Sequence, residues 1–294
     1  MTTVNPTRTD RLRTLLAQDT CHAMPCCWDG LSAKMIAEAG YPFTFMSGFA
    51  VSASRIGAPD TGLISFGEML DQGRNICAAT SVPVLGDGDT GYGNAMNVRR
   101  TVQSYAQAGF AAIMIEDQVS PKRCGHTKGK RVVSRSEAVN RIKAAVDARN
   151  EGADIMILAR TDARHSHGLD EAIWRAKAFR DAGADILFVE APQSVEEMRQ
   201  ITSQVGGIHM ANLIEDSVTP LLTTEELHEI GYKIAAYPLT VLSAAMNAIR
   251  ANLDALKTGV YPRHSGMSFD ELKRHVGFDA YYELEQRYDD KRED

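Results

Sequence analysis

The sequence predicts an α/β fold, a (β/α)8 barrel, on three observations. Short apolar runs of β-prone residues alternate with longer segments of helical hydrophobic spacing, which is the pattern of a parallel sheet with crossover helices. Eight such runs occur, each almost continuously apolar, as expected of strands covered on both faces. Eight strand–helix units therefore occupy about 240 residues, close to the length typical of this barrel. A doubly wound sheet usually has five or six such units.

The elements follow one another regularly along the chain. Strands are expected at residues 22–26, 41–46, 82–85, 111–115, 154–159, 185–189, 208–211 and 232–236. Helical segments between them include 30–40, 97–109, 136–152, 171–183, 195–205 and 224–231, and several end in glycine, the residue best suited to a helix C-cap.

The remaining C-terminal residues exceed what a barrel needs. One amphipathic helix is expected at 242–256 and one or two more at 269–287. A barrel needs only one helix after its eighth strand. We therefore expect a single barrel domain, 1–294, in which residues 242–294 form a helical extension that packs on a neighbouring subunit.

Composition and charge narrow the function. The 294 residues include 38 Asp+Glu and 32 Lys+Arg, a formal net charge of −6, so nothing draws the chain as a whole toward nucleic acid or an anionic membrane. No apolar run approaches the ~20 residues of a membrane span, and the N-terminus lacks the apolar core of a secretory signal. Five cysteines without a CxxC pair indicate neither a zinc site nor a disulfide framework. We expect a cytoplasmic protein.

Acidic residues dominate the carboxyl ends of the predicted strands, where the active site of such a barrel lies. Asp87 and Asp89 follow the third strand in the glycine-rich run GDGDTG, and Glu116 ends the fourth. Paired carboxylates that would otherwise repel are held together by a divalent cation, and oxygen ligands favour Mg²⁺ or Mn²⁺ over Zn²⁺. The alternative is a tight turn without a ligand.

Basic residues also reach this rim. Arg160 ends the fifth strand and suits a bidentate clamp on a substrate carboxylate, although a structural salt bridge is the alternative. Residues 118–136 contain no acidic residue and crowd basic side chains around Cys124. Such a loop is either a solvated connection or a lid whose thiol, with a pKa lowered by neighbouring cations, acts as an acid or base.

The motifs taken together resemble a known family. SGF, GDGDTGYG, EDQxxPKRCGH, ARTDA, FVEAP and ANLIE, in order from about residue 23 to 239, resemble the isocitrate lyase/phosphoenolpyruvate mutase superfamily. The resemblance implies a (β/α)8 barrel, Mg²⁺ as cofactor, and a homotetramer in which C-terminal helices swap between subunits.

The resemblance also implies roles for single residues. Asp87 and Asp89 would hold Mg²⁺ directly or through water, with Asp60 and Glu116 in the outer shell. Cys124 would lie on a gating loop and act, with Arg160 and Glu190, in catalysis. Substrate contacts are expected from Ser47, Gly48, Phe49, Gly125, His126, Arg160, Asn212 and Ile214.

Departures from the family pattern narrow the substrate. The thiol marks branches that cleave C–C bonds and is missing from mutases that move phosphorus. Methylisocitrate lyases carry arginines where Ser243 and Phe269 stand here, so a third carboxylate would be left unpaired, which favours a dicarboxylate. The branch resembling 2,3-dimethylmalate lyase, petal death protein and oxaloacetate hydrolase remains. Its hydrolases favour a serine where Pro238 stands, although Thr240 is near.

We therefore expect a Mg²⁺-dependent lyase that cleaves a substituted 2-hydroxy dicarboxylate, like 2,3-dimethylmalate or the related 2-methylisocitrate, to a 2-oxo acid such as pyruvate plus a carboxylic acid. One alternative is hydrolysis of oxaloacetate to oxalate and acetate. A second is a non-catalytic barrel that acts as a binding protein.

Overall fold

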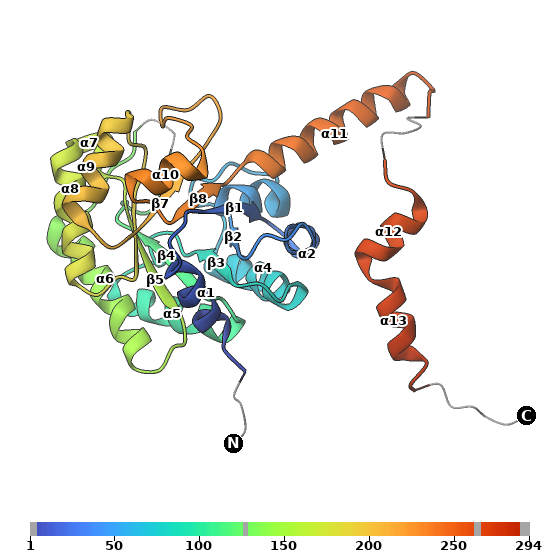
Figure 1. Cartoon of the computed structure of the whole chain (residues 1–294), viewed down its shortest axis with the longest axis horizontal. Helices are drawn as coiled ribbons and strands as arrows, with labels where there is room; N and C mark the ends of the chain where they lie inside the picture. The colour runs from blue at the N-terminus through green and yellow to red at the C-terminus, as the bar shows by residue number, and fades with distance from the viewer. Residues whose placement is uncertain (1–4, 126–128, 262–265, 289–294) are drawn as a thin grey trace, which may run out of the picture. The chain divides into compact units, whose positions relative to one another are not determined.

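The computed structural model describes residues 5–125, 129–261 and 266–288 (Figure 1). The chain divides into two compact units, Met1–Val241 and Leu242–Asp294. Among the helices of the described segments, none is both long and apolar enough to cross a membrane.

The first unit is a closed barrel of eight parallel strands in sequence order, which confirms the predicted fold class. The last strand closes the barrel on the first, with His22 opposite Ile234 and Pro25 opposite Tyr237. Each predicted strand is present within a few residues of its expected bounds. The strands are β1 (His22–Cys27), β2 (Thr44–Met46), β3 (Val84–Asp87), β4 (Ala112–Glu116), β5 (Met156–Thr161), β6 (Ile186–Val189), β7 (Ile208–Asn212) and β8 (Ile234–Tyr237).

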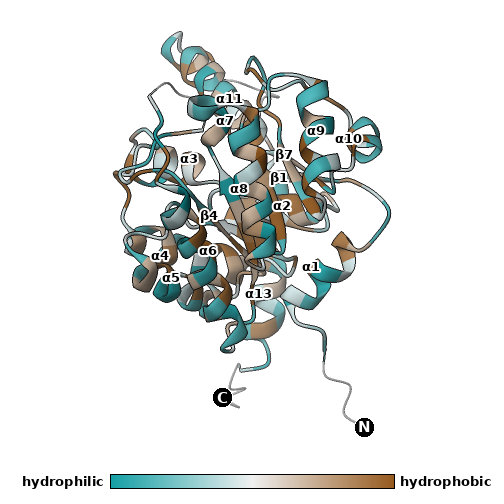
Figure 2. Ribbon diagram, turned by 90° about the vertical axis from the view of Figure 1, so that its left-hand side faces the viewer, coloured by the Kyte–Doolittle hydropathy of each residue, from teal (hydrophilic) through white to brown (hydrophobic). Residues whose placement is uncertain are grey.

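Helices surround the strands, and the six predicted between them are present. The outer ring comprises α2 (Gly30–Glu38), α4 (Phe66–Ala79), α5 (Ala95–Ala108), α6 (Arg135–Asn150), α8 (Leu169–Asp181), α9 (Val195–Val205) and α10 (Thr224–Ile230). Short helices α3 (Gly48–Val51) and α7 (Ala163–His167) and the π-helix η1 (Ser52–Ile56) lie in the connections after β2 and β5. In Figure 2, teal residues recur along outer helices such as α8, while brown residues gather toward the strands.

An N-terminal helix that the sequence pattern did not predict closes the barrel from below. Helix α1 (Arg8–Leu16) packs Leu12 and Leu16 into the same core cluster as Phe43 of the segment before β2. Arg8 donates to the carbonyl oxygens of Cys77 (2.7 Å) and Thr80, which ties α1 to the end of α4. The helix seals the end of the barrel opposite the predicted site.

Alternation along each strand separates two cores and positions the site. Met114, Leu158 and Phe188 fill the barrel interior together with Phe45 and Leu85, while Ile113 and Ile157 pack against the helices. Because side chains alternate with a period of two, the next inward position on each strand points into the mouth of the barrel. Those positions carry Ser47, Asp87, Glu116, Arg160, Glu190 and Asn212.

The second unit is helical and exposes a regular apolar stripe. It contains most of α11 (Thr240–Lys257), with α12 (Phe269–Val276) and α13 (Phe278–Glu285). Met246, Ile249, Leu253 and Leu256 recur every three or four residues along α11, and each is more than half exposed. This spacing is typical of a helix that packs on another helix. The swap of these helices between subunits stays a prediction.

Candidate active site

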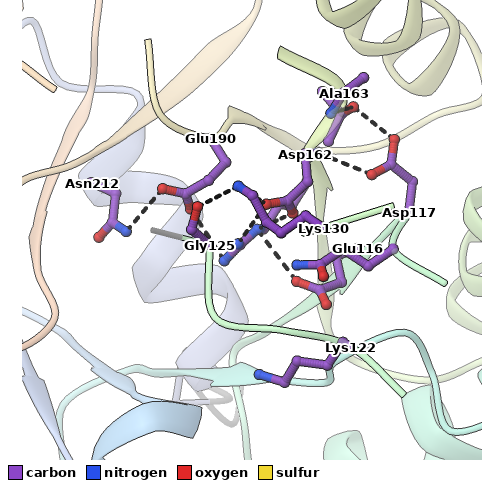
Figure 3. Close-up of polar contacts among 12 residues, drawn as sticks. Glu116, Asp117, Lys122, Gly125, Lys130, Asp162, Ala163, Glu190 and Asn212 are labelled. Carbon is purple, nitrogen blue, oxygen red and sulfur yellow. Dashed lines mark hydrogen bonds and ion pairs between the residues drawn. The ribbon is translucent and has the colours of Figure 1, made fainter. Parts of the chain in front are cut away.

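A cavity lies at the carboxyl ends of the strands, above the apolar interior, with a volume of about 60 Å³. Its floor is apolar, made by Phe45, Met114, Phe188 and Met210. Polar side chains from the strand ends and from the loop after β4 form its walls (Figure 3). The barrel therefore offers a small polar site above an apolar floor that excludes water.

One wall is acidic and is built around Asp87. Its carboxylate accepts hydrogen bonds from the backbone N–H of Gly48 (3.2 Å) and of Asp89 (3.0 Å). The approach needs glycine at position 48, because a Cβ there would collide with Asp87 Oδ2. Asp89 itself has φ +49°, a left-handed conformation that turns the chain directly after the strand. The GDGDTG run thus places two carboxylates beside the mouth.

Lys122 of the loop after β4 inserts its ammonium into this acidic wall. Its Nζ lies 2.6 Å from Asp60 Oδ1 and 2.9 Å from Asp89 Oδ1, and all three side chains are buried. Burial lowers the pKa of Lys122, but Asp89, Asp87 and Asp60 outweigh it and hold that pKa well above its ordinary value. Burial also raises the pKa of Asp89 to about 6, against the opposing effect of Lys122. The wall thus holds three carboxyl groups, of Asp60, Asp87 and Asp89, against the one ammonium of Lys122.

This wall suits a hard divalent cation. Asp60, Asp87 and Asp89 supply only oxygen donors, and the buried Oε1 of Glu116 has no hydrogen-bond partner among the described residues. Across residues 5–125, 129–261 and 266–288, no three His, Cys, Asp or Glu side chains converge on a single point as ligands. The lysine ammonium bridges Asp60 and Asp89 instead. A cation that met these carboxylates would relieve the same repulsion that Lys122 now relieves.

The opposite wall is organised by Arg160 at the end of β5. Its Nε and Nη2 bind both oxygens of Asp162 at 2.8 and 3.0 Å, so the expected bidentate clamp is made to a protein carboxylate. Nε also lies 3.3 Å from Glu116, and Nη1 lies 3.2 Å from Glu190. Asn212 donates to Glu190 Oε1 at 3.5 Å. Asp162 thus engages Nε and Nη2 of the guanidinium, and Glu190 engages Nη1.

A second loop lysine completes this wall. Lys130 Nζ lies 2.8 Å from Asp162 Oδ1 and donates to the carbonyl oxygen of Gly125 (Figure 3). Burial raises the pKa of Asp162, but Arg160 and Lys130 prevail and hold it well below its ordinary range. Asp162 therefore stays ionised and joins the strand end to the loop.

The loop brings the predicted thiol to the edge of the cavity. Cys124 and Gly125 both line it, and Cys124 is partly buried. Gly125 is packed so closely that a Cβ there would lie 2.8 Å from Glu190 Cδ and in collision with Arg160 Nη2. The other four cysteines are buried. Burial raises the pKa of Cys27 to about 12, in agreement with a structural role, whereas the equally buried Cys26 lines the cavity.

Most of the predicted site residues meet around this cavity. Those that line it are Ser47, Phe49, Asp60, Asp87, Cys124, Gly125, Arg160, Glu190, Asn212 and Ile214. Gly48, Asp89 and Glu116 lie directly behind them through the contacts given above. His126 was predicted to bind substrate and lies outside the described residues.

Three charged residues of the site had no predicted role. Asp162 follows Arg160 by two positions, and strand alternation alone places both on the same side. Lys122 and Lys130 belong to the basic loop, which charge pattern marked as unusual without indicating which of its cations turn inward.

Comparison with known proteins gives the family. The sequence profile of the phosphoenolpyruvate phosphomutase family matches residues 12–257. The chain is 42% identical to 2,3-dimethylmalate lyase of Eubacterium barkeri over 95% of this chain and 97% of that protein.

Solved structures agree over nearly the whole chain. The structure of oxaloacetate acetylhydrolase in complex with the inhibitor 3,3-difluorooxalacetate is 35% identical, with a TM-score of 0.93 over 98% of this chain and 99% of that one. Phosphonopyruvate hydrolase, solved with oxalate and Mg²⁺, is 28% identical with a TM-score of 0.85 over 96% and 99%. The Mg²⁺ in that phosphonopyruvate hydrolase structure indicates a divalent metal cofactor. The chain belongs to the isocitrate lyase/phosphoenolpyruvate mutase superfamily and is an enzyme of its carbon–carbon lyase type.

Proposed function

We propose that this enzyme cleaves the C2–C3 bond of a substituted 2-hydroxy dicarboxylate and releases a 2-oxo acid, with 2,3-dimethylmalate as the preferred substrate and pyruvate as its product. The observation that carries the proposal is the division of one small cavity into two walls, with a cysteine at its edge. The acidic wall suits a metal-bound carboxylate and hydroxyl, and Arg160 with Asn212 suits the second carboxylate. A dicarboxylate spans both.

Mg²⁺ bound at Asp87 and Asp89, with Asp60 and Glu116 around it, would supply a Lewis acid for the carboxylate and neighbouring oxygen of the substrate. Ser47 and Phe49 line the cavity beside that end. Gly125 lines the opposite end, and Arg160 Nη1 faces Glu190 there. These groups bind and orient the two carboxylates, so that the C–C bond between them crosses the apolar floor.

The chain's own residues then move the protons. Glu190, oriented by Arg160 and Asn212, takes the proton of the C2 hydroxyl. The C2–C3 bond breaks as C2 becomes a carbonyl, and the electron pair passes to C3 and spreads into its carboxylate. Arg160 stabilises that charge, and the thiol of Cys124 donates a proton to C3, which leaves a carboxylic acid and a thiolate. Return of the hydroxyl proton to the thiolate through water restores both residues.

The loop after β8 favours cleavage over the alternative, hydrolysis of oxaloacetate. Pro238 lines the cavity and has no hydrogen to donate to a hydrated carbonyl. The nearby Thr240 hydroxyl donates instead to Glu215 Oε1 at 2.8 Å, so it is occupied outside the cavity. The structural likeness to oxaloacetate acetylhydrolase keeps that reaction as the second candidate.

The test is pyruvate release from 2,3-dimethylmalate, followed with lactate dehydrogenase and NADH, with Mg²⁺ and again with a chelator. Cys124→Ala should lose activity. Cys21→Ala, the same change at a buried cysteine away from the cavity, should retain it. Oxalate formed from oxaloacetate, without pyruvate from dimethylmalate, would replace the lyase with the hydrolase. Activity that survives both the chelator and Cys124→Ala would reject the proposed roles.

We propose further that the enzyme acts in the cytoplasm as a homotetramer of (β/α)8 domains, with residues 242–294 packing on a neighbouring subunit. The exposed apolar stripe of α11 supports this, because such a stripe is costly to leave in water. Light scattering after size-exclusion chromatography tests the assembly.

A further inference from the structure

We infer that Lys130 and Gln118 are positioning residues that hold the Arg123–Cys124–Gly125 backbone from both sides and thereby set the place of the Cys124 thiol. The inference rests on the proposed function of Cys124 as proton donor. Neither side chain lines the cavity. Both would act through the backbone of the loop rather than on the substrate.

Lys130 is the charged anchor. Its side chain is 1% exposed, and its ammonium joins the carbonyl oxygen of Gly125 to the carboxylate of Asp162. A buried ammonium needs such partners, because an unpaired charge in the interior is strongly unfavourable. Asp162 is itself held in place, since its backbone N–H donates to Asp117 Oδ1 at 2.9 Å and its carboxylate binds Arg160. The position of Gly125 is thus tied to the end of β5.

Gln118 is the neutral anchor. Its Nε2 donates to the carbonyl oxygen of Arg123 at 2.9 Å, and its Oε1 accepts from the backbone N–H of the same residue at 2.9 Å. This pair of bonds fixes both the distance and the orientation of the Arg123 peptide groups. Gln118 is 1% exposed, so water does not compete for its amide. The residue directly before Cys124 is thereby held by a side chain of the strand-four connection.

Both anchors project from a paired base. Gln118 and Val132 form an antiparallel bridge, and the N–H of Val119 donates to the carbonyl oxygen of Arg131 at 2.9 Å. Arg141 of α6 donates to the carbonyl oxygen of Gln118 at 2.8 Å. Because this paired backbone segment is bound to the barrel, the two side chains that project from it can hold the thiol in a fixed place. Loss of either should leave the fold intact and loosen Cys124.

The experiment measures alkylation of Cys124 by iodoacetamide, followed by peptide mass spectrometry across a pH series, in the full-length protein. The variants are Lys130→Met and Gln118→Leu, which remove the polar contacts at nearly constant side-chain size. Arg131→Met is the matched control, because it removes an exposed cation next to Lys130. A change in thiol acidity moves the midpoint of the pH profile, whereas a loosened backbone raises the rate on its high-pH plateau.

We expect the plateau rate to rise roughly tenfold in both variants, as for loss of one buried hydrogen bond to a charged group or two neutral ones, and to stay unchanged in Arg131→Met. On the substrate, kcat should fall more than KM changes. Plateau rates within about twofold of wild type in both variants would overturn the inference. Should Lys130→Met fail to fold, Gln118→Leu decides alone. If the enzyme cleaves no dicarboxylate, the alkylation rates still test the positioning, so the two failures are distinguishable.

Discussion

Alanine at position 125 should displace the loop from the site without unfolding the barrel. The added Cβ would lie 2.8 Å from Glu190 Cδ and collide with Arg160 Nη2, whereas ordinary contact begins near 3.4 Å. Glu190 and Arg160 are buried in a charged cluster and cannot move aside at low cost. The loop therefore has to retreat by roughly half to one ångström. A misplacement of about one ångström can lower a rate on the order of 10²-fold.

Steady-state kinetics of Gly125→Ala on the active substrate give the result directly. We expect kcat/KM to fall roughly 10²-fold while the melting temperature changes little, because the affected loop contributes little to the apolar core. Gly67→Ala serves as the control. Gly67 lies in α4, where the nearest heavy atom to an added Cβ is Ser65 Oγ at 4.0 Å, so activity should be unchanged.

Wild-type kinetics for Gly125→Ala would refute the reasoning, because the loop would then not need to approach Arg160 and Glu190 during turnover. A large loss of thermal stability together with the loss of activity would also count against it. That result would make the collision a folding defect rather than a displacement of the loop.

Three further predictions concern charge and assembly. Lys122→Met should lower the stability of chelator-treated protein by about 3 kcal/mol, with Mg²⁺ restoring part of it; equal melting temperatures in chelator would contradict this. Burial lowers the pKa of His209 to about 4 from an ordinary 6.5, so the neutral form is favoured in the fold and stability is lost as pH falls from 6.5 to 4, by roughly 3 kcal/mol. In urea unfolding, the free energy of unfolding should fall less between pH 7 and pH 5 in His209→Gln than in wild type. An equal fall in both proteins would exclude the effect. Leu253→Glu should reduce the proposed tetramer to smaller species in light scattering, and an unaltered mass would count against the α11 stripe as an interface.

The barrel could be predicted because its signal is repeated. Eight apolar runs at regular intervals leave few other architectures, and a misplaced boundary in one run does not alter the count. Helix α1 lacks that support. It occurs once, before the first strand, and its buried Leu12 and Leu16 stand among charged residues, so its role at the bottom of the barrel depends on contacts distant in sequence.

The strand-end residues of the site were accessible to the same reasoning. Arg160 and Glu190 come directly after an apolar run, and Asp87 comes two residues after one. The fold brings all such positions to one mouth. The pairings among them were not accessible. The clamp predicted between Arg160 and substrate is made to Asp162, because the three carboxylates and the guanidinium that are buried together must first satisfy one another.

The lysines of the basic loop neutralise the acidic side chains of the rim. The role of either group therefore could not be interpreted without the other. Lys122 faces Asp60 and Asp89 on one wall, while Lys130 joins Arg160 at Asp162 on the other. Withdrawal of the loop would leave the first wall with carboxylates alone. It would leave Arg160 as the nearest cation to Glu116, Asp162 and Glu190 on the second.

Buried carboxylates repel one another strongly at these separations. We therefore expect the loop to withdraw its lysines only where another cation takes their place. A divalent ion held by Asp87 and Asp89, with Asp60 beside it, would do so on the first wall. It would not serve the second wall, where Arg160 already lies between the carboxylates. Lys130 therefore has no substitute there. Its loss should displace the Gly125 backbone whether or not metal is bound. Alkylation of Cys124 can therefore be measured in metal-free protein with the same expected outcome.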